Sequence, residues 1–427
     1  MRFLMRFNSL FNLSLRGSSL VFRFVLSFYI IKFLGLEASG IYGLALGAVG
    51  IAPALLGWGL NYFVARDIVG LGLAEAAPRV KTRLFVTTVS LAAATLLALV
   101  LALATGYRIG RIDVFITILI WLEVYSADIH IALIAMEKAV EANVLVFIRL
   151  AAWVPFVIGL GVAFSELRTL EAIFVGWIAS YAVAFGFLLY VIRHLPMRET
   201  LSTPLEKAWV TERLKGSWYI YVADLGLVGL VYVDRYIVSF LLGLKLTGLY
   251  TFYWSLANSL QTLMATAVVQ LALPALFKAH NSGMIDRWRS TMRRQLIKTA
   301  SFSTAIAVAL FITCEAFMGY LNMPELAQHR DVFVLMLVAA IVRCCSDLFN
   351  VGLTSMRKDN LYATINLAGL FLTGAMAYVM ISRFGFLGTG IATLATALIV
   401  ATVRAAFLVT FIRRQTQGGP PPQGTGS

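Results

Sequence analysis

Long apolar segments separated by short polar breaks fill almost the whole chain. Segments of about 20 apolar residues are long enough to cross a bilayer as a helix. This pattern predicts twelve membrane helices: 18–34, 40–64, 84–105, 112–135, 143–164, 170–192, 217–242, 248–277, 296–320, 332–355, 361–381 and 386–412. Pro53, Pro155 and Pro274 predict kinks in the second, fifth and eighth of these helices.

Composition agrees with this pattern. Hydrophobic residues make up 60% of the 427 positions and charged residues 13%, and the mean hydropathy is +0.85. No soluble globular domain approaches these values, so we expect an all-α, multi-pass membrane protein.

The Lys and Arg residues of the loops indicate the orientation. The loops on one side are far richer in Lys and Arg than those on the other, so the positive-inside rule places both termini in the cytoplasm. The inner groups include Arg79, Lys81, Arg83, Arg287, Arg289, Arg293 and Arg294, and the sparser outer ones are Arg108, Arg111, Arg168, Lys245, Arg330 and Arg383. Topology therefore explains most of the net charge of +14, and we expect no nucleic-acid partner.

One short motif occurs twice, roughly half the chain apart. Residues 34–42 read LGLEASGIY and residues 242–250 read LGLKLTGLY, with five of the nine positions identical. Six predicted helices separate the copies. An even number places both copies on the outer face, so the halves are expected to be parallel repeats about an axis along the membrane normal.

This repeat divides the chain into two six-helix bundles, 18–192 and 217–412. The polar segment 193–216, with Pro196 and Pro204, is the expected cytoplasmic linker with some amphipathic helix. Residues 1–17 are expected to form a retained helical segment in the inner interface rather than a cleaved signal peptide, because no small-residue cleavage site follows. The Gly-, Pro- and Gln-rich end, 413–427, is expected to be a disordered cytoplasmic tail.

Motifs for enzymatic chemistry are missing from the sequence. It contains no Gly-rich phosphate loop followed by Lys and Ser or Thr, and no Ser-His-Asp or metal-ligand spacing. The cysteines and histidines lie singly or in apolar segments: Cys314, Cys344, Cys345, His130, His194, His280 and His329. The outer loops are too short to hold a glycosyltransferase or polymerase site. We therefore expect a transporter without a cofactor, with H⁺ or Na⁺ coupling as an option.

Charged residues inside the predicted helices are the candidate functional residues, because each costs about 2.5–3.5 kcal/mol at a helix centre. Arginine forms a fork of donors suited to phosphate oxygens. The predicted substrate-binding residues are Arg23, Arg149, Arg235, Arg343 and Arg404. The predicted ion-coupling residues are Glu123, Asp128, Asp224 and Asp234.

Plainer interpretations of the same charges stay open. Arg343 and Asp347 are four residues apart on one helix face and are placed to neutralise each other. Arg23 and Arg149 lie near helix ends, where snorkelling explains them. Asp234 and Arg235 are adjacent, so their side chains must find partners on other helices. The acidic residues can equally be counter-ions to arginines.

Several motifs together resemble a known family. They are 34–42 (LGLEASGIY), 57–60 (GWGL), Arg66-Asp67, 232–238 (YVDRYIV), 248–250 (GLY), 273–276 (LPAL) and 384–392 (FGFLGTGIA). Over nearly the whole chain these are similar to Wzx-type polysaccharide flippases of the multidrug/oligosaccharidyl-lipid/polysaccharide (MOP) exporter superfamily. The lipid II flippase branch usually has more helices and more arginines in helix one, and the multidrug branch favours an acidic cavity.

The resemblance implies a MATE-like V-shaped pair of bundles in which helices one, two, seven and eight line a central cavity. The implied function is translocation of an undecaprenyl-diphosphate-linked oligosaccharide across the bacterial inner membrane for O-antigen, capsule or exopolysaccharide assembly. A polysaccharide polymerase and glycosyltransferases would be partners. One alternative is an ion-coupled antiporter of organic cations that uses Glu123, Asp128 or Asp224. Another is a scaffold that recruits glycosyltransferases through its basic inner loops.

Overall fold

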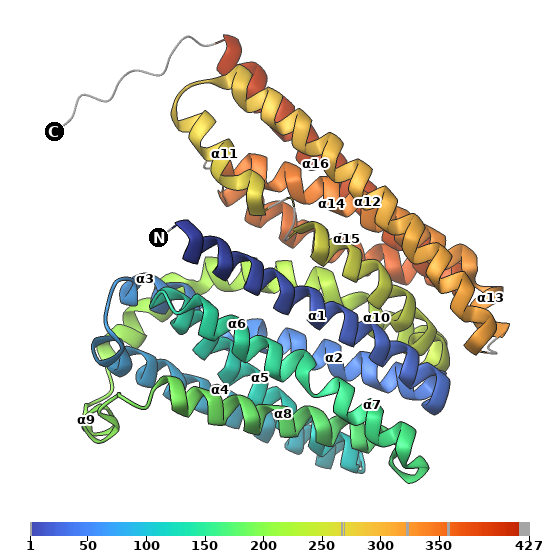
Figure 1. The fold of residues 1–427 in the computed structure, drawn as a ribbon, viewed down its shortest axis with the longest axis horizontal. Coiled ribbons are helices and arrows are strands. Elements are labelled where there is room, and N and C mark those ends of the chain that lie inside the picture. The colour runs from blue at the N-terminus through green and yellow to red at the C-terminus, as the bar shows by residue number, and fades with distance from the viewer. Residues whose placement is uncertain (1, 266–267, 269, 322–323, 357–358, 418–427) are drawn as a thin grey trace. The chain divides into compact units, whose positions relative to one another are not determined.

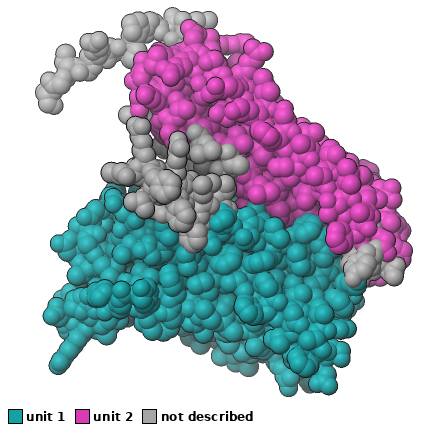
Figure 2. All heavy atoms as spheres, viewed as in Figure 1, with its two compact units in different colours: residues 1–232 teal, residues 233–427 magenta. Residues whose placement is uncertain are grey.

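The computed structural model describes residues 2–265, 268, 270–321, 324–356 and 359–417. Every regular element in these ranges is a helix (Figure 1). The chain forms two compact units, Met1–Tyr232 and Val233–Ser427 (Figure 2). Of the expected disordered tail, residues 413–417 belong to the last helix, and residues 418–427 lie outside the described part of the chain.

The first unit holds nine α-helices and the beginning of a tenth. They are α1 (Arg2–Leu34), α2 (Leu36–Gly57), α3 (Leu60–Ile68), α4 (Leu73–Thr105), α5 (Arg111–Ala135), α6 (Ala139–Phe147), α7 (Val154–Ala163), α8 (Leu170–Val191), α9 (Met197–Ser202) and α10 (Lys207–Met264). A π-helical segment, η1 (Ile148–Ala152), joins α6 to α7, and a 3-10 turn, η2 (Ser165–Leu167), precedes α8.

Within the described residues, the second unit contains the rest of α10 and six further helices. They are α11 (Gln270–Asn281), α12 (Ile285–Leu321), α13 (Pro324–Gln328), α14 (Arg330–Ser355), α15 (Asp359–Phe384) and α16 (Leu387–Gln417).

The expected membrane fold is confirmed. Eleven helices within the described ranges are long and apolar enough to cross a membrane. One of them, α10, has 58 residues, or about 87 Å at 1.5 Å per residue, far more than a hydrocarbon core of about 30 Å requires. Its backbone is non-helical at Gly243, which divides it into the seventh predicted crossing and the first part of the eighth.

The two repeat copies share one backbone conformation. Gly35 has φ 89° and ψ 178°, and Gly243 has φ 78° and ψ 177°. This region of φ/ψ space is accessible almost only to glycine. The Leu-Gly-Leu sequence therefore breaks the helix in the same way in both halves, which supports the internal repeat.

Two irregularities lie in the predicted helices that contain proline. In the fifth predicted helix, η1 ends at Ala152, shortly before Pro155. Proline has no N–H to donate to the carbonyl of Ala151, and its ring would clash with that carbonyl in a regular turn. In the second, Pro53 lies inside α2. The helix is interrupted later, where Trp58 and Gly59 have φ 54° and 66°.

Aromatic and aliphatic side chains fill the core of each unit. In the first unit Leu26, Phe174 and Trp177 belong to one buried cluster, and the indoles of Trp153 and Trp177 stack with centroids 6.3 Å apart. In the second unit Trp288 is fully buried in a cluster with residues of α11, α14 and α16.

Candidate functional site: intramembrane charges

Asp128 of α5 forms a buried ion pair with Arg83 of α4. Arg83 Nη2 lies 2.9 Å from Asp128 Oδ1, and the two side chains are 1% and 2% exposed. Arg83 Nε also donates to Asn61 Oδ1 at 2.8 Å, and the Thr87 hydroxyl donates to the Asp128 carboxylate. A buried carboxylate needs partners of this kind. The network satisfies Asp128 and explains why it is retained inside the bilayer.

The sequence alone does not identify Arg83 as a buried residue. It directly precedes the predicted helix 84–105, and the hydrophobic pattern therefore places it among the inner-loop charges. In the structure α4 begins earlier, at Leu73, so Arg83 lies well within the helix. The burial of Arg83 depends on its ion pair with Asp128 of α5, and the sequence does not show that these two helices are neighbours.

Glu123, also on α5, pairs with Arg149. Arg149 Nη1 and the Tyr181 hydroxyl both donate to Glu123 Oε2, and the Arg149 and Glu123 side chains are 8% and 14% exposed. Arg149 lies in η1, and its carbonyl accepts from the Ser180 hydroxyl at 3.2 Å. Arg149, a predicted substrate-binding residue, and Glu123, a predicted ion-coupling residue, thus neutralise each other.

A cavity of about 380 Å³ borders Arg149 and Tyr181. Apolar side chains such as Leu84, Leu145 and Phe185 form most of its wall. Its one guanidinium, Arg149, is already paired with Glu123. An anionic headgroup would find little additional positive charge here, so this cavity is a poor candidate for diphosphate binding.

In the second unit, the adjacent residues Asp234 and Arg235 have separate surroundings, as their spacing predicted. Both are buried. The Asp234 carboxylate accepts from the Tyr250 hydroxyl and from the backbone N–H of Arg235 at 2.8 Å. The Arg235 guanidinium lies 4.2 Å from the ring centroid of Trp254, a cation–π contact that partly replaces its lost hydration.

Asp347 of α14 pairs with Arg404 of α16. Arg404 Nη1 lies 3.4 Å from Asp347 Oδ1 and 2.8 Å from the Ser346 hydroxyl, and Arg404 Nη2 donates to Asn366 at 2.7 Å. The second Asp347 oxygen accepts from Gln261 at 2.8 Å. The helical i, i+4 pairing of Asp347 with Arg343 is not formed.

Two of the five predicted substrate-binding arginines have neither an ion pair nor a cation–π contact with the residues that the structure describes. Arg23 in α1 and Arg343 in α14 are half-buried. Neither makes a side-chain hydrogen bond or an ion pair with the residues that the structure describes. Asp224 of α10 is exposed and is likewise without an ion pair in the described part of the chain. These three side chains are therefore the ones placed to contact a ligand or ion.

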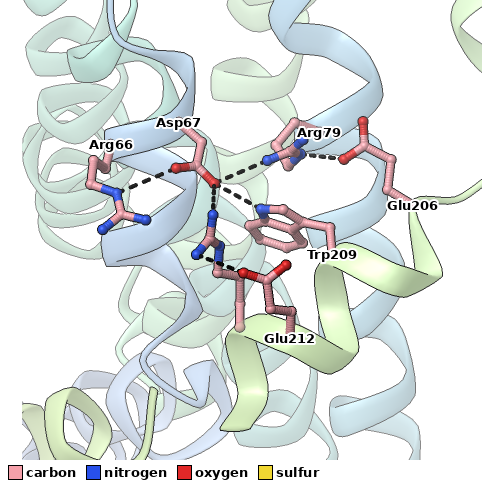
Figure 3. Close-up of polar contacts among 7 residues, drawn as sticks. Arg66, Asp67, Arg79, Glu206, Trp209 and Glu212 are labelled. Carbon is pink, nitrogen blue, oxygen red and sulfur yellow. Dashed lines mark hydrogen bonds and ion pairs between the residues drawn. The ribbon is translucent and has the colours of Figure 1, made fainter. Parts of the chain in front are cut away.

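A separate cluster surrounds Asp67 at the end of α3 (Figure 3). The Asp67 carboxylate accepts from Trp209 Nε1 at 2.8 Å. It also faces Arg79 at 3.1 Å, Arg66 at 3.4 Å and Arg213 at 3.5 Å. Partial burial raises the pKa of the Asp67 carboxyl. The Trp209 hydrogen bond and the charges of Arg213 and Arg66 outweigh that effect, so the pKa lies below its ordinary value.

The same cluster attaches the segment before α10 to α4. Arg79 bridges from Asp67 to Glu206, and the backbone N–H of Glu206 donates to the Thr82 hydroxyl at 3.2 Å. Lys81 donates to the carbonyl of Thr200 at 3.0 Å. The predicted linker, which contains the short helix α9, is therefore held against α4.

Sequence comparisons give no relatives: no family model and no curated protein sequence matches the chain. Solved structures with the same fold do exist. An inward-facing multidrug resistance MATE family transporter of the MOP superfamily superposes with a TM-score of 0.67 at 13% identity, covering 96% of this chain and 100% of that one.

Two further structures agree. An outward-facing MATE family transporter of the MOP superfamily gives a TM-score of 0.56 at 11% identity, with 96% of each chain covered. A point mutant of the Vibrio cholerae MATE transporter VcmN gives 0.57 at 15% identity, again with 96% of each chain covered. The chain thus has the fold of MATE transporters of the MOP superfamily.

Proposed function

We propose that this chain is a secondary transporter that moves an undecaprenyl-diphosphate-linked oligosaccharide from the inner to the outer leaflet of a bacterial inner membrane. The observation that carries the proposal is the pair of intramembrane arginines, Arg23 and Arg343, which have no carboxylate partner among the described residues. One lies in each compact unit.

The energetics favour a ligand for these two side chains. A guanidinium in the hydrocarbon region costs about 2.5–3.5 kcal/mol on insertion scales, and Arg83, Arg149 and Arg404 each offset that cost with an acid. Arg23 and Arg343 form no ion pair with the residues that the structure describes, although the charge of Arg343 does act on Asp347 from a longer distance. A diphosphate provides several oxygens for bidentate, charge-assisted hydrogen bonds, and it would supply the missing negative charge during transport.

The second candidate is an ion-coupled antiporter of organic cations, the class that the multidrug resistance names of the fold neighbours suggest. Asp224 favours it, because this carboxylate is exposed within a membrane-spanning segment. Glu123 and Asp128 are weaker candidates for coupling, since each is already neutralised by an arginine.

The test uses the purified full chain in liposomes that contain a fluorescent undecaprenyl-diphosphate oligosaccharide. A membrane-impermeant reagent that quenches outer-leaflet dye measures how fast the lipid crosses. Arg23→Ala and Arg343→Ala should each slow crossing at least about tenfold, the effect of losing a charge-assisted contact of about 1.5 kcal/mol. Arg23→Lys should recover part of the rate if the positive charge matters more than the two parallel hydrogen bonds that a guanidinium can donate.

The matched control is Arg289→Ala, which removes an exposed arginine of α12 and should leave the rate unchanged. Full activity of both Arg23→Ala and Arg343→Ala would overturn the proposal. A wild-type protein that moves no lipid, but exchanges an organic cation in a manner abolished by Asp224→Asn, would establish the second candidate instead.

A further inference from the structure

A basic cavity of about 470 Å³ lies in the second unit, in the hairpin of α11 and α12. Lys278 of α11 and Arg287, Thr291 and Arg294 of α12 line it, and none of its lining residues is acidic. The three cations form no ion pair with any residue the structure describes. This cavity plays no part in the proposed transport site.

The helical spacing concentrates the positive charge on one face. Arg287, Thr291 and Arg294 follow at i, i+4 and i+7, so their side chains lie above one another on α12. Arg289 and Arg293 lie on the same helical segment but do not line the cavity. The cavity is therefore basic because of where these particular side chains lie on α12, and not only because the segment is rich in arginine.

An adjacent face of this segment is fixed in the core. Trp288 is fully buried, and its indole Nε1 donates to the Ser355 hydroxyl at 3.1 Å. Met292 is buried one turn later. Because these anchors hold the start of α12 against α14, the arginines beside them are presented without the cost of ordering a mobile helix.

We propose that this hairpin cavity binds a phosphate group, through Lys278, Arg287 and Arg294. The distribution of Lys and Arg predicts that the hairpin faces the cytoplasm, where the headgroups of anionic phospholipids carry phosphate. Basic pockets on that side of membrane helices recognise such headgroups. A soluble phosphate offers the same chemistry, and the experiment separates the two sources.

The experiment measures lipid binding to the purified full chain in detergent by native mass spectrometry, with phosphatidylglycerol as the probe and phosphatidylcholine as the zwitterionic comparison. Two double variants remove the same amount of charge from the same helical segment. Arg287→Ala/Arg294→Ala changes the cavity, whereas Arg289→Ala/Arg293→Ala changes its surroundings. The cavity variant should bind phosphatidylglycerol about tenfold more weakly, and the control should change by less than about twofold.

Inorganic phosphate distinguishes the sources. If it binds without lipid and shows the same dependence on Arg287 and Arg294, the site takes a soluble phosphate; if it neither binds nor displaces phosphatidylglycerol, the site takes a lipid headgroup. Arg287→Lys/Arg294→Lys keeps the charge and should retain most of the affinity, which guards against a folding defect. Equal losses in the two alanine variants, or no loss in either, would overturn the proposal.

Discussion

Replacing Asp128 by Asn tests whether this carboxylate is a structural counter-ion, as its contacts indicate. Asn has nearly the same size and can still accept one hydrogen bond, but it removes the negative charge. The Arg83 guanidinium, 1% exposed, would then have the amide oxygen of Asn61 as its remaining acceptor on another side chain.

The expected loss of stability is large. Removing one partner of a buried ion pair costs about 3–5 kcal/mol, because the remaining charge is left uncompensated. We expect Asp128→Asn to lie at the lower end, about 3 kcal/mol, since one hydrogen bond can be kept. The apolar double variant Arg83→Met/Asp128→Leu removes both charges and should lie within about 1 kcal/mol of the wild type.

The assay is equilibrium unfolding in detergent, followed by tryptophan fluorescence. It is applied to Asp128→Asn and to a cycle of Arg83→Met, Asp128→Leu and their double variant. Asp286→Asn is the control, because that side chain is fully exposed and should change the free energy of unfolding by less than about 0.5 kcal/mol. The counter-ion assignment would be refuted if Asp128→Asn were as stable as this control while ion-coupled transport were lost.

Two other predictions concern stability. The pKa of Asp67 is lowered in the folded state, so its stabilising effect is present at neutral pH and is lost as pH falls through that value. The difference in melting temperature between wild type and Asp67→Asn should stay constant from pH 8 to about pH 5 and shrink below about pH 4; a difference that grows with acidity would contradict this. Gly35→Ala and Gly243→Ala should each cost about 1–3 kcal/mol through backbone strain, although a Cβ would meet no neighbour at either position. Gly186→Ala, in the middle of α8 with open space around it, should be neutral or stabilising by up to about 1 kcal/mol, and equal losses at all three glycines would contradict the strain account.

The membrane helices and the repeat could be predicted because both depend on local sequence. A run of about 20 apolar residues predicts a membrane crossing whatever helices it packs against. The Leu-Gly-Leu break needs the backbone freedom of glycine, which is why Gly35 and Gly243 are recognisable as equivalent before their dihedral angles are known. The break at Trp58 and Gly59 could not be predicted, because the apolar run continues across it and no proline marks it.

The partners of the intramembrane charges could not be predicted, because they come from distant helices. The local i, i+4 rule suggested Arg343 for Asp347, yet the ion pair is made by Arg404 of α16. Asp128 pairs with Arg83, which precedes the predicted helix 84–105 and is therefore expected in a loop. Sequence alone gives the number of charges in the membrane, whereas tertiary packing decides which of them are neutralised.

Transport of the two cargo classes by the wild-type protein is the most direct test of the central claim. Liposomes containing the full chain would be assayed in parallel for crossing of the undecaprenyl-diphosphate oligosaccharide and for gradient-driven uptake of an organic cation. Our account predicts rapid crossing of the lipid and no cation uptake above that of empty liposomes. Cation uptake driven by an H⁺ or Na⁺ gradient, with the lipid remaining in its original leaflet, would contradict it.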